Sequence, residues 1–192
     1  MEFIKNAKKI VYEINYKLSK SNLVIQSFGN GSQRVSESEF IIKPSGVNLD
    51  TVDENDMSHI YINNHSRNSG LKPSSDEPTH REIYINSDFI GGIVHTHSQY
   101  ATAYAQALME IENLGTTQSD YVQNSILCSR PLTRSEVEND YEKNTGTVIH
   151  ETLKKQNLDY SDVPGILVAH HGVFSWGENL IEAFKNAEII EY

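Results

Sequence analysis

Residues 91–97, Gly-Gly-Ile-Val-His-Thr-His (GGIVHTH), place two histidines at the end of a short apolar run. Side chains two residues apart in a β-strand project from the same face, so His95 and His97 are expected to point into one space. Two imidazoles on one face can share a metal ion, although an H-x-H pattern at a strand end also occurs without metal. This stretch alone leaves both interpretations open.

A second apolar run, GILVA at 165–169, ends in His170 and His171 just before Gly172. One of these two histidines can emerge at a strand end as His95 and His97 do, but the residues do not say which. Three imidazoles with an open fourth position are typical of a catalytic zinc site. The alternative is one structural histidine with a backbone hydrogen bond and one exposed histidine. Among the others, His59 and His65 are expected at the surface, and His80 and His150 are expected on helices, not as ligands.

Length and charge restrict the class of protein. The 192 residues predict a single domain, 1–192. The formal net charge is −10 and the lysines and arginines are scattered, which argues against a nucleic-acid or anionic-membrane partner. Cys128 is the only cysteine, so no intramolecular disulfide can form, and no early apolar run has the length of a signal peptide or membrane span. We therefore expect a cytoplasmic protein.

Hydrophobic periodicity predicts an α/β fold in which a largely antiparallel sheet is flanked by helices. Thr133 and Glu136 form a possible capping box at the start of one long helix, and Gly146 is its expected weak point. A polar loop is expected at 64–73. Helices are expected at 3–14, 78–87, 99–111, 133–155 and 178–190; strands are expected at 23–28, 39–44, 58–63, 91–97 and 125–130, with two more around a turn at Gly172 within 163–177.

Three turns rich in small residues, at 27–32, 43–46 and 74–75, follow apolar runs or precede a helix. Backbone N–H groups in such turns, together with hydroxyl groups, can bind a phosphate. Each turn alone is more often an ordinary turn or cap. The three together indicate an anion site.

Several longer motifs carry a resemblance to a known family. In chain order they are GNGSQR, FIIKPSGV, KPSSDEPTH, GGIVHTHSQYATAYAQ, GTTQSDY, CSRPLTRSEVENDYEKNTG and LVAHHGVFSWG. From about Ser27 to Tyr192, the chain resembles the L-ribulose-5-phosphate 4-epimerase branch of the class II aldolase/epimerase family. The resemblance implies a three-layer class II aldolase-like fold. It also implies that His171, the histidine next to the glycine, joins His95 and His97 as a ligand.

The activity implied by the resemblance is zinc-dependent epimerisation of L-ribulose 5-phosphate to D-xylulose 5-phosphate. The C4 hydrogen is not adjacent to the carbonyl, so inversion proceeds by retro-aldol cleavage of the C3–C4 bond and re-addition to the other face of the aldehyde. Zinc (Zn2+) acts as Lewis acid and template. The implied residues are Asp76, which ligates or lies against the zinc; Asp120, which transfers protons; and Asn30, Lys43, Ser45, Gly46, Ser74 and Ser75, which bind the substrate phosphate.

The resemblance also implies a homotetramer in which Asp120 reaches the zinc of a neighbouring subunit. Related fuculose- and rhamnulose-phosphate aldolases have a glutamate where this chain has Asp76, which favours the epimerase branch. Family members continue some tens of residues beyond Tyr192, and that tail carries a second acid/base tyrosine, so the tail is expected to be absent here and epimerisation slow. Gln118 replaces a histidine found in relatives. A sugar-phosphate aldolase, or a homologue that binds zinc and sugar phosphate without turnover, is the alternative.

Overall fold

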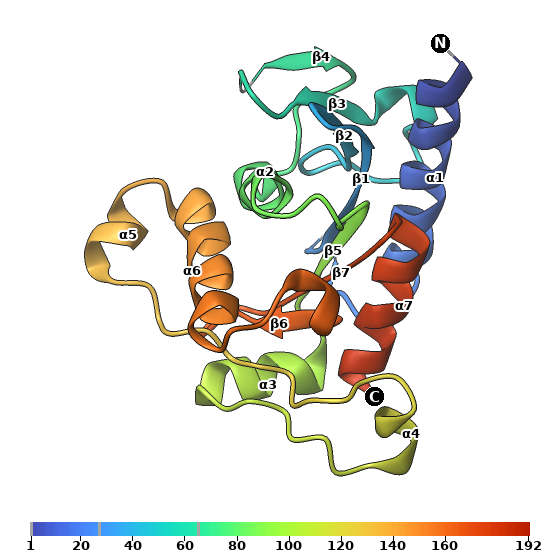
Figure 1. Ribbon diagram of the computed structural model, residues 1–192. Helices are drawn as coiled ribbons and strands as arrows, with labels where there is room; N and C mark the ends of the chain where they lie inside the picture. Colours follow the sequence, from blue (N-terminus) through green and yellow to red (C-terminus); the bar gives the residue numbers. More distant parts are fainter. Residues whose placement is uncertain (1, 27, 65) are drawn as a thin grey trace.

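The computed structural model describes residues 2–26, 28–64 and 66–192 (Figure 1). The expectations for Ser27 in the first turn and for His65 lie outside these residues. Within them, the strands form one seven-stranded sheet in the order β4-β3-β2-β1-β5-β7-β6, and each neighbouring pair is antiparallel. The strands are β1 (Asn30–Ser36), β2 (Glu39–Ile42), β3 (Ser58–Tyr61), β4 (Arg67–Ser69), β5 (Gly92–Thr96), β6 (Gly165–Leu167) and β7 (Val173–Gly177).

Helices cover both faces of the sheet, which gives the three layers expected from the sequence (Figure 1). One layer contains α2 (Glu77–Ile85) and α6 (Tyr141–Lys155), and the opposite layer contains α1 (Glu2–Ser19) and α7 (Leu180–Glu191). The shorter helices are α3 (Gln99–Ala107), α4 (Thr116–Ser119) and α5 (Arg134–Glu138), and single 3-10 turns occur at Glu54–Asp56 and Tyr160–Asp162.

Along the central strands, successive side chains alternate between the two faces of the sheet, and each face carries its own hydrophobic core. Ile93 of β5 belongs to the hydrophobic cluster that includes residues of α2 and α6, whereas its neighbour Val94 belongs to the cluster with residues of α1 and α7. Phe40 and Ile41 of β2 divide in the same way. Because side chains two apart share a face, His95 lies on the Ile93 side, toward α2 and α6. The register of β5 thus decides which layer surrounds the histidines.

A third hydrophobic cluster joins α3, which lies below β6 in Figure 1, to β6 and β7. It contains Ala101 and Ala105 of α3 with Leu167 and Val173. This contact fixes the segment that follows His97. No helix in the described part of the chain is long and apolar enough to cross a membrane.

The strand predicted at 23–28 is wrong. The first strand, β1, starts at Asn30, two residues after the end of the predicted range. In the described part of 23–28 only an isolated bridge joins Ile25 to Phe28. Strand β1 has a polar sequence because its side chains make structural hydrogen bonds: Gln33 accepts from the backbone N–H of Leu180, and Arg34 donates to the carbonyl groups of Tyr84 and Ile90. Hydrophobic periodicity does not detect such a strand.

The strand predicted at 125–130 is also wrong. Ile126 and Cys128 each form only an isolated bridge, to Ile111 and Leu167 respectively. The polar loop predicted at 64–73 contains the short edge strand β4. His59, expected at the surface, is 4% exposed and lies beside Glu39 and the ring of Tyr61.

The long helix predicted at 133–155 is two helices. Its capping box is present, since Thr133 Oγ1 accepts from the N–H of Glu136 and the Glu136 carboxylate accepts from that of Thr133. The break falls at Asp140, whose φ of +56° is left-handed, and α6 begins at the next residue.

Gly146 is not the weak point of this helix. It lies inside α6, where a Cβ atom would be 2.5 Å from Cβ of Glu82 and 3.0 Å from the carbonyl oxygen of Thr79. The missing side chain therefore allows α6 to pack closely on α2.

Candidate metal centre

His95 and His97 lie at the end of β5 and face one another, as the sequence predicts. Their Nε2 atoms are 2.9 Å apart. Nδ1 of His95 lies 2.8 Å from the carbonyl oxygen of Val173, to which it donates its hydrogen, so the lone pair of the neutral ring is on Nε2. A backbone acceptor of this kind is a common outer partner of metal-ligating histidines.

The turn between β6 and β7 selects His171 over His170. The N–H of His171 donates to the carbonyl of Val168 at 3.0 Å, and His170 has φ of +62°, as the third residue of such a turn requires. The side chain of His170 is exposed, whereas that of His171 faces His95 and His97. A Cβ atom on Gly172 would lie 2.5 Å from the carbonyl oxygen of Thr96, so this position needs glycine.

His95, His97 and His171, called the histidine triad below, form an almost equilateral arrangement. Their ring centroids are 4.7, 4.8 and 4.9 Å apart, and one ligand nitrogen from each ring lies within 4.8 Å of the others. Nitrogen atoms in a tetrahedral shell with Zn–N distances of about 2.0–2.1 Å are about 3.3 Å apart. The spacing in the triad spans this value, and the three residues could hold one metal ion.

Burial keeps the triad in the neutral form that metal binding requires. It lowers the pKa of His97 to about 4 and that of His171 to about 3, with the neighbouring rings adding to the effect. Burial also lowers the pKa of His95. Near neutral pH the three rings therefore offer lone pairs rather than positive charge.

Asp76 lies beside the triad at the start of α2, and its carboxylate is held from β1. Nδ2 of Asn30 donates to Oδ2 of Asp76 at 2.6 Å. Burial raises the pKa of Asp76, but His95, His80 and the Asn30 amide outweigh burial and hold this pKa below its ordinary value. The carboxylate is outside the group of ligand atoms that lie within 4.8 Å of one another. Its expected place, ligating or lying against the metal, stays a prediction.

The predicted phosphate residues gather on loops next to Asp76. Backbone hydrogen bonds join two of these loops: Ser45 donates to Lys72 at 2.9 Å, and Ser74 donates to Lys43 at 3.0 Å. Asn30, Lys43 and Ser74 are buried, whereas Ser45, Gly46 and Ser75 are exposed. Lys43 and Gly46 also line a hollow of about 400 Å³. The structure thus places these residues together, but the side-chain amide of Asn30 is directed to Asp76.

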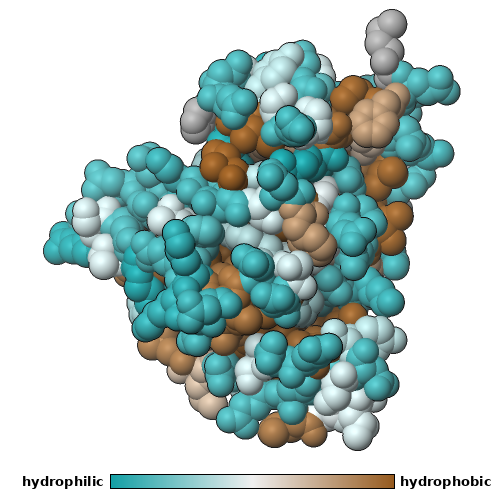
Figure 2. Space-filling view, in the orientation of Figure 1, coloured by the Kyte–Doolittle hydropathy of each residue, from teal (hydrophilic) through white to brown (hydrophobic). Residues whose placement is uncertain are grey.

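Asp120 is not brought to the triad of its own chain. It follows α4, which lies beside the C-terminal end of α7 in Figure 1, and its side chain is exposed. No interaction among the described residues joins it to a triad histidine. Hydrophobic residues are exposed in the same region, among them Leu114, which is 84% exposed. Figure 2 shows a mostly hydrophilic face with exposed hydrophobic residues along this lower edge.

Comparison with known families assigns this fold. Residues 9–192 match the model of the family described as "Class II Aldolase and Adducin N-terminal domain". The chain belongs to this family. Its members include enzymes of the class II aldolase and epimerase type, and the fold expected from the sequence is confirmed.

Solved structures of class II aldolase type have the same fold. An L-fuculose 1-phosphate aldolase is 23% identical, with a TM-score of 0.79, and the match covers 97% of this chain and 82% of that one. YgbL from Escherichia coli, titled a putative aldolase/epimerase/decarboxylase, is 22% identical with a TM-score of 0.75 over 98% of this chain and 86% of that one. L-fuculose-1-phosphate aldolase from Thermus thermophilus is 21% identical, with a TM-score of 0.69 over 98% and 90%.

Tyr141 is a residue of the class II aldolase domain that sequence reasoning missed. Its hydroxyl oxygen lies 3.3 Å from Nδ1 of His171, and the two ring centroids are 5.9 Å apart. If the Tyr141 hydroxyl accepts the hydrogen of His171 Nδ1, the lone pair of His171 is on Nε2, where it could bind a metal. Tyr141 is the first residue of α6, directly after the break at Asp140. The sequence predicts one continuous helix there and so does not single out Tyr141.

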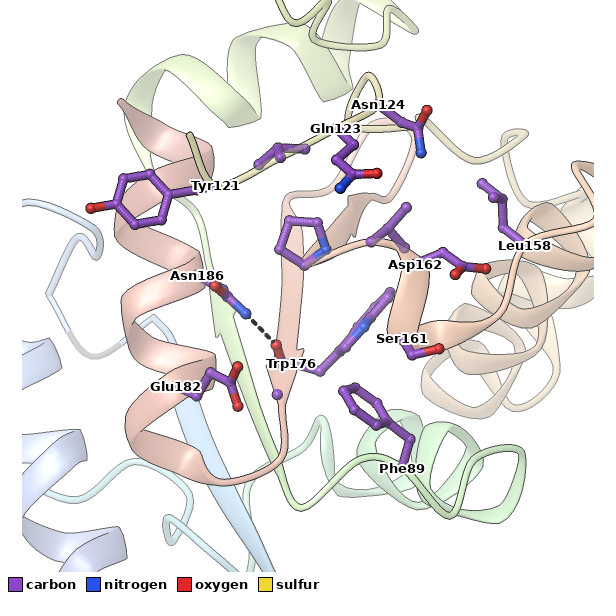
Figure 3. Close-up of a pocket in the computed structure, with 14 residues that line it drawn as sticks. Phe89, Tyr121, Gln123, Asn124, Leu158, Ser161, Asp162, Trp176, Glu182 and Asn186 are labelled. Carbon is purple, nitrogen blue, oxygen red and sulfur yellow. Dashed lines mark hydrogen bonds between the residues drawn. The ribbon is translucent and has the colours of Figure 1, made fainter. Parts of the chain in front are cut away.

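A pocket of about 620 Å³ lies apart from the histidine triad (Figure 3). It is bordered by Phe89, Tyr121, Trp176 and Glu182, and Asn186 of α7 donates to the carbonyl of Trp176 at 2.8 Å. None of its described lining residues is a predicted site residue. The pocket therefore shares no described lining residue with the candidate metal centre.

Proposed function

We propose that this class II aldolase-family chain is a zinc-dependent epimerase that converts L-ribulose 5-phosphate to D-xylulose 5-phosphate by breaking and re-forming the C3–C4 bond. The observation that supports the proposal most is the convergence of three neutral imidazoles beside Asp76 and next to loops rich in hydrogen-bond donors. Three histidine ligands leave a fourth position open, as catalytic rather than structural zinc sites do.

Zinc in this site would supply Lewis-acid stabilisation of the negative charge that develops when the carbon–carbon bond opens. The protein orients the imidazoles through two outer contacts, His95 to the Val173 carbonyl and His171 to the Tyr141 hydroxyl. Asp76 adds negative charge on the α2 side, where the amide of Asn30 restrains it. Zinc as the metal rests on this nitrogen ligand set.

The phosphate end of the substrate is assigned to Asn30, Lys43, Ser45, Gly46, Ser74 and Ser75. Lys43 brings a positive charge, and the exposed turn at Ser45 and Gly46 brings backbone and hydroxyl donors. Holding the phosphate retains the glycolaldehyde phosphate fragment while its aldehyde rotates and presents the other face. The proposed reaction depends on this retention, because loss of the fragment is aldolase chemistry.

Asp120 is the proposed proton-transfer residue. Since it is exposed and no described interaction joins it to the triad of its own chain, we assign it to the site of a neighbouring subunit in a homotetramer. In a cyclic tetramer one heterologous contact repeats around the ring, so each site receives one Asp120.

The test is an assay of the purified chain, loaded with zinc, on L-ribulose 5-phosphate. D-xylulose 5-phosphate and free glycolaldehyde phosphate are measured in the same reaction, with His97→Ala as the control that removes a ligand. Formation of the epimer as the main product supports the proposal. Release of the aldehyde as the main product assigns an aldolase instead, and zinc binding with no product assigns a binding protein.

A further inference from the structure

A chain of three buried polar side chains lies behind Asp76 and the triad. Oγ of Ser32 on β1 is 2.7 Å from Nδ1 of His80 and 2.8 Å from the hydroxyl of Tyr84, both on α2. Ser32 and His80 are 0% exposed and Tyr84 is 1% exposed. Water therefore cannot compete for these hydrogen bonds, and each donor needs a protein acceptor.

Only one direction of these two hydrogen bonds gives both hydroxyl hydrogens an acceptor. If Tyr84 donates to Ser32 and Ser32 donates to Nδ1 of His80, no hydroxyl hydrogen is left without an acceptor. In the reverse order the hydroxyl hydrogen of Tyr84 is buried without a described acceptor, which is unfavourable. The guanidinium of Arg34, 4.8 Å from the Tyr84 ring centroid, also favours the phenol as donor.

This order determines the tautomer of His80. Burial lowers its pKa to about 3, so the ring is neutral and carries one hydrogen. Because Nδ1 accepts from Ser32, the hydrogen is on Nε2. That atom is buried and has no hydrogen-bond partner among the described residues.

Asp76 is the negatively charged acceptor near the His80 ring. The N–H of His80 donates to the carbonyl of Asp76, which places the two side chains four residues apart in the first turn of α2. The Asp76 carboxylate raises the pKa of His80, and His80 lowers the pKa of Asp76, so the two side chains lie near each other. The hydrogen bonds that described residues make to the Asp76 carboxylate fall on Oδ2, which leaves Oδ1 available to a second donor.

We propose that Tyr84, Ser32 and His80 form a relay that fixes the Nε2–H tautomer of His80 and directs that hydrogen at Asp76, so that His80 positions the carboxylate against the metal. His80 is a positioning residue, not a ligand, since it acts through Asp76. The inference deepens the proposed metal site and rests on the assignment of Asp76 to it. It does not depend on which sugar phosphate the site takes.

The first test reads the tautomer directly in the full chain. In a long-range 1H–15N spectrum of protein labelled with 15N-histidine near neutral pH, the His80 signals are assigned by their loss in His80→Gln. The expected pattern is that of an Nε2–H ring, and Tyr84→Phe is expected to reduce the fraction of that tautomer. An Nδ1–H pattern for His80 in the unchanged protein would overturn the relay.

The second test separates positioning from general structural support. Zinc alone is the probe, and its affinity is measured by competition with a chelator. His80→Leu is expected to weaken binding about tenfold, the lower end of typical outer-partner effects. His80→Gln keeps an N–H near the same place and is expected to recover most of the affinity.

The same change in an Asp76→Asn background decides whether His80 acts through Asp76. The expected result is that His80→Leu then weakens zinc binding less than twofold, because the two residues act as one unit. An equal tenfold loss in both backgrounds, or an Asp76→Asn protein that binds zinc as the unchanged chain does, would contradict the proposal. Both tests read the tautomer and the metal, so absence of epimerase activity would disprove the proposed function and leave the relay standing.

Discussion

Nδ2 of Asn30 lies 2.6 Å from Oδ2 of Asp76, so the first residue of β1 holds the residue that precedes α2. Asn30 is 2% exposed, and water cannot replace its amide. The hydrogen bond therefore connects the strand next to β5 to the side chain that lies beside the triad. It also means that Asn30 reaches a phosphate only if its amide leaves Asp76.

Asn30→Ala is expected to lower the free energy of unfolding by about 1–3 kcal/mol, because a partly buried carboxylate loses its closest donor. Urea denaturation near neutral pH measures the change. Asn68→Ala, at an exposed position of β4, is the matched control and is expected to change stability by less than about 0.5 kcal/mol. Equal stability of the two variants would show that the hydrogen bond contributes little.

His171→Ala is expected to lower zinc affinity at least about 100-fold, more than the typical cost of losing an outer partner. His170→Asn, at the preceding residue, is the control, since asparagine tolerates the left-handed φ of +62° and His170 faces solvent. Elemental analysis of protein purified without chelator and a competition titration give stoichiometry and affinity. If His170→Asn lost zinc and His171→Ala kept it, the assignment within the pair would be reversed.

This pair illustrates what the sequence can and cannot predict. The apolar run before His170 and His171 predicts a strand end, and the shared face of His95 and His97 follows from the two-residue period of a strand. The residues alone do not choose between His170 and His171, because the choice depends on the left-handed turn. The family resemblance chose His171, and the turn explains that choice physically.

The errors in the fold have a common cause. Strand β1 is held by polar contacts across the molecule, and the break at Asp140 lies at a residue with a left-handed φ; local hydrophobic periodicity indicates neither. Tyr141 was missed because the break was missed. The three layers could be predicted from hydrophobic alternation, and the three histidines from short motifs, because both patterns are local in the sequence.

Tyr141→Phe is expected to weaken zinc binding about tenfold while leaving the fold intact, because the ring stays and only the acceptor for His171 Nδ1–H is removed. The competition titration used for His171 measures it. Tyr100→Phe, at an exposed position of α3, is the control. If both variants bind zinc like the unchanged chain, the 3.3 Å contact does not orient His171.

Chelator-treated protein is expected to lose stability as the pH falls from about 6.5 to about 4. His80 has a pKa of about 3 in the folded chain, below its value of about 6.5 when unfolded, so the unfolded chain binds more protons between these values. The free energy of unfolding therefore rises with pH in this window, by up to about 1.4 kcal/mol per pH unit for one such group, and levels off above it. His97 and His171 act in the same direction. Urea denaturation at several pH values measures the slope, which His80→Gln should reduce; a flat profile would contradict the burial argument.

The last prediction tests whether Asp120 serves a neighbouring subunit. Asp120→Asn is expected to lower turnover about 10²–10⁴-fold, since general acid–base groups contribute that much. Zinc affinity is expected to stay unchanged, because Asp120 is exposed and makes no described contact with the triad of its own chain. His97→Ala is expected to be inactive for a different reason, the loss of a ligand.

Mixing the two inactive variants provides the decisive measurement. In a cyclic tetramer assembled at random from equal amounts, about a quarter of the sites combine an intact triad from one subunit with an intact Asp120 from the next. Co-expressed variants carrying different affinity tags, purified by both tags in sequence, should therefore regain a substantial part of the turnover, while each variant alone does not. If Asp120 acts across the subunit boundary, turnover is regained only in tetramers that contain both variants. If the purified mixed assembly stays inactive, or if the active protein has the mass of a monomer by light scattering, Asp120 does not act across a subunit boundary.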